Sequence, residues 1–174
     1  MEERTKKITI TAVFAALIFV ATVVIPIPIP ATGGYVNLGD AIILLAVWNL
    51  GGKRAGIAAA VGAGLADLFL APIYAPGTLV IKFLMAIAAY GVYKTISASN
   101  LHKSISWIVS AFVSEVIMIV GYLVYEGMIL GLGYGALAGV SGNVLQGGVS
   151  ITIAFVLIQT LEATKITERL LKTV

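Results

Sequence analysis

The chain has 174 residues, of which 60% are hydrophobic and 11% are charged. Soluble domains carry about 25% charged residues, so this composition indicates an integral membrane protein with one compact domain over residues 1–174. The chain contains no cysteine, which excludes disulfides and thiolate metal sites. The formal net charge of +3 does not indicate nucleic-acid binding, because the basic residues are distributed as in a multi-pass membrane protein.

Apolar segments follow one another along the chain, and proline, glycine or basic residues separate them. A membrane-spanning helix needs about 20 predominantly apolar residues, and somewhat fewer when it packs against others. The sequence therefore predicts an all-α bundle of six transmembrane helices, over residues 8–25, 38–50, 55–70, 78–93, 105–125 and 135–161.

The connections between these helices have distinct compositions. The first, Pro26–Pro30, alternates proline with isoleucine and is predicted to be extended, because proline cannot donate a helical hydrogen bond. It continues as an outer loop to residue 37. Further connections are expected over residues 51–54, 72–77, 94–104 and 126–134, and a basic amphipathic tail is expected after the last helix.

Basic residues gather at the two ends of the chain and in alternate connections. Short cytoplasmic loops collect lysine and arginine, so both termini are expected on the cytoplasmic side, and Lys82 alone departs from the pattern. The residues that carry this expectation are Arg4, Lys6, Lys7, Lys53, Arg54, Lys94, Lys103, Lys165, Arg169 and Lys172.

Four ionisable residues fall inside the apolar segments: Asp40, Asp67, Lys82 and Glu115. Such residues are rare within a membrane and mark functional sites by default. The first three are expected at similar depth, in the outer third of the bundle. They either line an outward-facing cavity, or Asp67 and Lys82 form an ion pair that joins the third and fourth helices.

Other polar residues fall on faces of the last two helices. Glu115, Tyr122 and Glu126 are spaced by seven and four residues and share one face, as do Asn143 and Gln146 at a spacing of three. Amides within a membrane either bond neighbouring helices or bind a ligand, and both interpretations remain open for this pair.

Tyrosines occur in each of the outer connections, at Tyr35, Tyr74 and Tyr134. Anchoring at the membrane interface explains each one taken singly. Together they are placed to close over a flat ring.

Small residues four positions apart, Ala12 and Ala16, lie on the first helix near its cytoplasmic end. Such spacing lets two helix backbones approach closely, so a membrane partner is expected there.

Catalytic motifs are missing from the sequence. The single histidine, His102, lies in a loop, and no HExxH, GxSxG or phosphate-binding glycine motif occurs. An intramembrane enzyme is therefore disfavoured, and no cofactor is expected. A stand-alone proton-coupled transporter or channel, with Asp67, Lys82 and Glu115 as its relay, remains an alternative.

Several short segments occur in a recognisable order: Tyr35–Ala41, Gly51–Gly56, Gly64–Leu68, Tyr74–Thr78 and Ile81-Lys82. In this order, within a six-helix chain of this size, they resemble the substrate-binding S components of energy-coupling-factor (ECF) vitamin transporters. The similarity is to the riboflavin-type branch, which also includes members assigned to hydroxymethylpyrimidine and pyridoxine.

The resemblance implies a subunit of a prokaryotic plasma membrane that captures a vitamin from outside. It docks through small residues of the first helix, here Ala12 and Ala16, on a membrane-embedded coupling (T) subunit driven by two cytoplasmic ATPases. The residues that the resemblance places around the ligand are Tyr35, Asn37, Asp40, Asp67, Tyr74, Lys82, Glu115, Tyr122, Glu126, Asn143 and Gln146.

Acidic residues outnumber basic ones in this set, which disfavours an anionic ligand. A neutral or cationic heteroaromatic ring with N–H and O–H donors fits better, because a carboxylate accepts hydrogen bonds from it and a tyrosine stacks on it. Hydroxymethylpyrimidine or pyridoxine is favoured, with riboflavin next.

Overall fold

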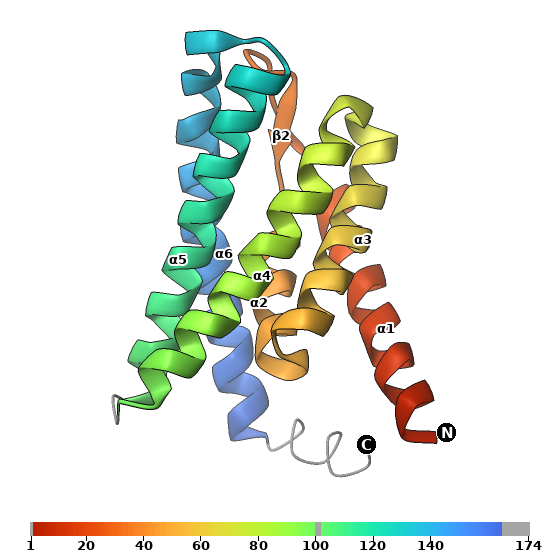
Figure 1. Cartoon of the computed structure of the whole chain (residues 1–174), viewed down its shortest axis with the longest axis vertical. Coiled ribbons are helices and arrows are strands. Elements are labelled where there is room, and N and C mark those ends of the chain that lie inside the picture. Colours follow the sequence, from red (N-terminus) through yellow and green to blue (C-terminus); the bar gives the residue numbers. More distant parts are fainter. Residues whose placement is uncertain (1, 100–101, 165–174) are drawn as a thin grey trace.

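The computed structural model describes residues 2–99 and 102–164, which form six α-helices (Figure 1). The all-α bundle predicted from the sequence is confirmed. The helices are α1 (Glu2–Val24), α2 (Gly39–Leu50), α3 (Gly52–Leu70), α4 (Ala75–Ser97), α5 (Lys103–Val124) and α6 (Leu137–Ala163).

The helices extend beyond the apolar segments that predict them, most of all at the start of α1, which begins at Glu2. Hydropathy marks only the part of a helix within the membrane, whereas backbone hydrogen bonding continues into polar turns. Lys7 pairs with Glu3 one turn away and supports the first turns of α1. At the start of α5, the His102 side chain accepts a hydrogen bond of 3.4 Å from the backbone N–H of Ser104.

Four of the helical segments in the described chain are long and apolar enough to cross a membrane: Glu2–Val24, Pro72–Ser97, Lys103–Ile129 and Gly133–Ala163. The segment α3 carries Lys53, Arg54 and Asp67. The segment α2 has 12 residues, about 18 Å at 1.5 Å per residue, which is shorter than a hydrocarbon core. Most of its residues are buried, so the surrounding helices shield α2 from lipid.

The short helix α2 lies at the centre of the packing. Ile43 and Ala46 pack in one apolar cluster with Ile18 of α1 and Ala59 of α3. The opposite side of α2, including Leu44, packs in a second cluster with residues of α5 and α6. The bundle is therefore built around α2.

The proline-rich connection is a β-hairpin of β1 (Ile27–Ile29) and β2 (Gly34–Val36). The strands are antiparallel, and Pro28 lies opposite Tyr35. The hairpin has only these two strands, so Pro28 occupies an edge, where its missing N–H leaves no bond unmade. The extended conformation predicted from the alternating prolines is confirmed.

The outer connections contain short helical turns that the sequence did not predict. A 3₁₀ turn, η1 (Pro72–Tyr74), leads into α4, and η3 (Gly133–Ala136) leads into α6. The expected loop over residues 126–134 is wrong in its first part, because a π-helical turn, η2 (Tyr125–Ile129), continues α5. The glycines at 131 and 133, with φ of 74° and 53°, then reverse the chain.

The two ends of the bundle differ in charge. Figure 1 places the starts of α1, α3 and α5 and the end of α4 at one end, with the hairpin at the other. The basic residues from Arg4 to Lys103, apart from Lys82, therefore gather at one end, as a cytoplasmic side requires. Lys165, Arg169, Lys172 and the tail expected to contain them lie outside the described residues.

Candidate ligand-binding site

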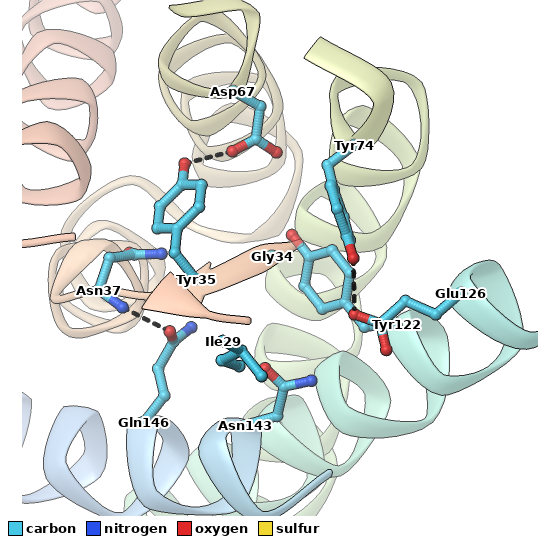
Figure 2. A pocket seen from close by; sticks show the side chains of 10 residues that line it. All are labelled: Ile29, Gly34, Tyr35, Asn37, Asp67, Tyr74, Tyr122, Glu126, Asn143 and Gln146. Atoms are coloured by element: carbon cyan, nitrogen blue, oxygen red, sulfur yellow. Dashed lines mark hydrogen bonds between the residues drawn. The ribbon is translucent and has the colours of Figure 1, made fainter. Parts of the chain in front are cut away.

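A cavity lies beneath the hairpin, among the outer ends of α3, α5 and α6 (Figure 2). All of the predicted ligand contacts except Asp40, Lys82 and Glu115 line it. The lining residues are Ile29, Gly34, Tyr35, Asn37, Asp67, Tyr74, Tyr122, Glu126, Asn143 and Gln146.

The cavity has a free volume of about 20 Å³, which is about the space that one water molecule needs. Figure 2 shows the rings of Tyr35, Tyr74 and Tyr122 standing around this space. The site is therefore closed in this structure, and a ring-shaped ligand requires the lining to move apart.

One wall of the cavity is built on Asp67, near the end of α3. Its two carboxylate oxygens accept hydrogen bonds from the Tyr35 hydroxyl of β2 and the Thr78 hydroxyl of α4. The Tyr122 hydroxyl of α5 lies 2.8 Å from the Thr78 hydroxyl. Burial, and then the nearby charge of Asp67, raise the pKa of the Tyr35 phenol, so this hydroxyl keeps its proton and acts as a donor.

A second wall is built on Glu126, which the π-helical turn η2 directs inward. The Tyr74 hydroxyl lies 2.8 Å from the Thr32 carbonyl oxygen and 3.1 Å from Glu126 Oε1. A hydroxyl has one proton, so it cannot donate fully to both acceptors. Glu126 Oε2 is buried and accepts no hydrogen bond within the described structure. Gly139 of α6 makes room for this oxygen, since a Cβ there would lie 2.8 Å from it.

The third wall is α6, where Asn143 and Gln146 differ in their bonding. Gln146 Oε1 accepts a hydrogen bond of 2.7 Å from the Asn37 backbone N–H, and Gln146 Nε2 donates one of 2.5 Å to Asp40. Gln146 therefore bonds the hairpin to α2. The Asn143 side chain has no hydrogen-bond partner in residues 2–99 and 102–164 and faces the cavity. It is the free amide of the site.

Asp40 and Lys82 lie beneath the cavity rather than in its lining. Lys82 Nζ lies 2.6 Å from Asp40 Oδ1, and both side chains are almost fully buried. Lys82 Nζ also lies 5.3 Å from the centre of the Tyr122 ring. The alternative in which Asp67 and Lys82 form an ion pair is wrong: Lys82 joins α4 to α2, while hydroxyl groups bind Asp67. The proton relay of Asp67, Lys82 and Glu115 is accordingly not found as one connected set.

Glu115 lies deeper in the bundle than the cavity. It shares a helix face with Tyr122, but seven residues correspond to about 10 Å along the axis. Its carboxylate packs near Gly147, where an added Cβ would lie 3.3 Å from Oε2, and neither oxygen has a hydrogen-bond partner among the described residues. The helix periodicity gives the correct face but not the depth.

Some site features were not foreseen, and one aromatic was misplaced. Thr78, which bonds Asp67, was missed although it lies one turn before Lys82 on the same helix face. Ile29 and Gly34 line the cavity through the hairpin register, for which the sequence carries no direct signal. Tyr134 is 92% exposed and takes no part in the lining, so its expected role in closing the site is wrong.

Away from the cavity, Ala12 and Ala16 are exposed near the middle of α1, as a contact surface for another helix requires. Elsewhere in the described chain, no group of three or more histidine or acidic side chains is arranged to hold a metal ion.

Comparison with known proteins gives a consistent result. An uncharacterized protein of Pyrococcus woesei is 46% identical over 63 residues, which is 36% of this chain and 43% of that protein. The solved structure of the S component of a bacterial ECF transporter superposes with a TM-score of 0.73 and 21% identity, covering 92% of this chain and 98% of the other. The likeness to this structure shows the fold.

Residues 2–163 match the family described as ECF-type riboflavin transporter, S component. This match covers nearly the whole chain, and the fold comparison agrees with it. The family consists of vitamin-binding subunits of membrane transporters rather than enzymes. The chain is a membrane protein that belongs to the family of ECF-type riboflavin transporter S components.

Proposed function

We propose that the chain captures a small heteroaromatic vitamin or precursor in the cavity beneath the hairpin. Hydroxymethylpyrimidine or pyridoxine is favoured, with riboflavin next. The observation that carries this proposal is the lining itself, which combines two carboxyl groups, a free amide and three tyrosine rings. Carboxyl and amide groups bond the edge of a heteroaromatic ring, and tyrosines stack on its face.

The charge of the lining supports a neutral or cationic ligand. Asp67 and Glu126 line the cavity, whereas the described lining contains no lysine, arginine or histidine. Lys82 is paired with Asp40 below. An anionic ligand would have to lose its hydration without gaining a cation, which is costly inside a protein.

The closed volume supports a single ring over a tricyclic one. The cavity now has a volume of about 20 Å³, so each additional ring of a ligand requires the lining side chains to move further apart. The hairpin is the element we expect to move, because hydrogen bonds from Tyr35 to Asp67 and from Asn37 to Gln146 hold it over the site. Lifting it breaks few contacts compared with separating two long helices.

Delivery of the ligand is proposed to follow the mode that the family resemblance implies. The subunit docks through Ala12 and Ala16 on a T subunit in a prokaryotic plasma membrane, and two cytoplasmic ATPases supply the energy. The exposure of both alanines supports this part of the proposal.

The decisive test is a calorimetric titration of the purified protein with hydroxymethylpyrimidine, pyridoxine, riboflavin, folate and biotin. We expect a single-ring ligand to bind most tightly and the two anionic vitamins to bind weakly. Failure of every member of the panel to bind below about micromolar Kd (about −8 kcal/mol) would remove the proposal.

A matched pair of amide variants locates the site. Asn143→Ala should weaken binding by about 1–3 kcal/mol, because it removes the free amide of the cavity. Asn49→Ala is the control, since Asn49 lies at the other end of the bundle and bonds only the Leu45 carbonyl oxygen. Equal vitamin affinity in the two variants would show that the ligand does not bind in this cavity.

A further inference from the structure

A second cavity, distinct from the ligand site, opens between the first half of α1 and the start of α3. Its volume is about 690 Å³. Its walls are mainly apolar and include Ile8 and Ala12 of α1 and Ile57 and Val61 of α3. The groove ends where the two helices touch, since a Cβ at Gly62 would lie 2.4 Å from the Ala15 carbonyl oxygen.

The charged end of this groove carries an excess of cations. Arg4 and Lys7 of α1 and Arg54 of α3 line it, together with Glu3. Glu3 pairs with Lys7, which leaves Arg4 and Arg54 without a carboxylate partner in the described chain. Two unpaired guanidinium groups thus stand at the mouth of an apolar groove.

This combination matches one kind of molecule. A phospholipid has an anionic phosphate next to an acyl chain, in the same order as the arginines and the apolar walls. Guanidinium groups bind phosphate oxygens in pairs, and basic pockets between membrane helices on the cytoplasmic side bind acidic head groups. In Figure 1 the start of α1 stands at the edge of the bundle, at the end where the basic residues gather.

We propose that this groove binds an anionic phospholipid, with its phosphate on Arg4 and Arg54 and an acyl chain along Ile8, Ala12 and Ile57. A partner helix fits less well, because it would have to bring its own acidic groups to both arginines. Ala12 also belongs to the proposed docking pair, so the lipid must leave the groove when the coupling subunit docks.

The test uses the full chain alone in nanodiscs that contain equal amounts of phosphatidylglycerol and phosphatidylcholine. A photoreactive amino acid at position 57 captures the neighbouring lipid, which mass spectrometry identifies. Position 65 is the matched control, because Ile57 and Leu65 lie on the same helix and are 52% and 46% exposed. We expect the captured phosphatidylglycerol to be enriched roughly 25-fold at position 57, since two basic residues contribute about fivefold each, and to follow the bulk composition at position 65.

Charge variants then assign the selectivity. The double variant Arg4→Gln with Arg54→Gln should remove the enrichment. Each change alone should lower it roughly fivefold, because one basic residue contributes about 1 kcal/mol to the binding of an anionic lipid. Lys53→Gln, next to the groove but outside its lining, should leave it unchanged. Thermal unfolding checks that all variants remain folded.

Three outcomes overturn the proposal: equal capture of both lipids at position 57, enrichment that survives the double arginine change, or a cross-linked dimer of the chain in place of lipid. The vitamin titration does not enter this test, so the two proposals fail independently.

Discussion

At the scale of single residues, the buried ionisable side chains differ in what surrounds them, and Glu115 stands apart from the other four. Asp67 and Glu126 face the cavity, and Tyr35 and Tyr74 donate hydrogen bonds to them. Asp40 and Lys82 satisfy each other below it. The sequence identified these residues because charges inside apolar segments are rare, but it could not pair them. Pairing depends on the depth and rotation of each helix within the bundle. An error of one helical turn in depth is enough to place Lys82 beside Asp67 instead of Asp40.

Lys82→Met is expected to destabilise the protein by about 3–5 kcal/mol, because it leaves the Asp40 carboxylate buried without its cation. The double variant Asp40→Asn with Lys82→Met should recover much of this loss, since both charges are then absent. Thermal unfolding in detergent measures both. If the double variant is as unstable as the sum of the single changes, the two residues do not act as a pair.

Glu115→Gln should leave vitamin affinity within about twofold and keep or raise the melting temperature at neutral pH. The reason is that Glu115 lies outside the cavity and its oxygens are buried without partners, so an amide removes the cost of an unpaired charge. Calorimetry and thermal unfolding together check this. Loss of binding with unchanged stability would place Glu115 in contact with the ligand after all.

At the scale of elements, close contacts between helices depend on glycine. The length of the apolar segments predicted every α-helix, because such segments between proline, glycine or basic residues leave few alternatives. The π-helical turn was not predicted, because no residue type marks an added backbone position. It matters for the site, since it directs Glu126 toward Tyr74.

Gly62→Ala should lower stability by about 1–3 kcal/mol, because a methyl group there would meet the Ala15 carbonyl oxygen at 2.4 Å and force α1 away from α3. Gly148→Ala is the control, because nothing lies within 4 Å of a Cβ at that position in α6. It should be neutral or slightly stabilising. Thermal unfolding of the two variants side by side makes the comparison, and equal melting temperatures would argue against the tight helix contact.

At the scale of the whole molecule, the orientation in the membrane comes from the basic residues at one end of the bundle. The chain contains no cysteine, so single cysteines can be labelled without background. Tyr134→Cys, at a residue 92% exposed near the hairpin end, should react with a membrane-impermeant reagent in intact cells. Lys53→Cys should react only after permeabilisation. The reverse result would invert the proposed direction of capture.

The hydrogen bonds of the Gln146 side chain provide a way to measure whether the hairpin is closed or raised. Its oxygen binds the Asn37 backbone N–H of the hairpin segment, and its nitrogen binds Asp40 in the core. Raising the hairpin must release that single amide proton to solvent while the core stays intact. Hydrogen–deuterium exchange at Asn37 should therefore be slow in the closed, empty receptor, where this hydrogen bond is intact, and faster once a ring occupies the cavity and displaces the hairpin.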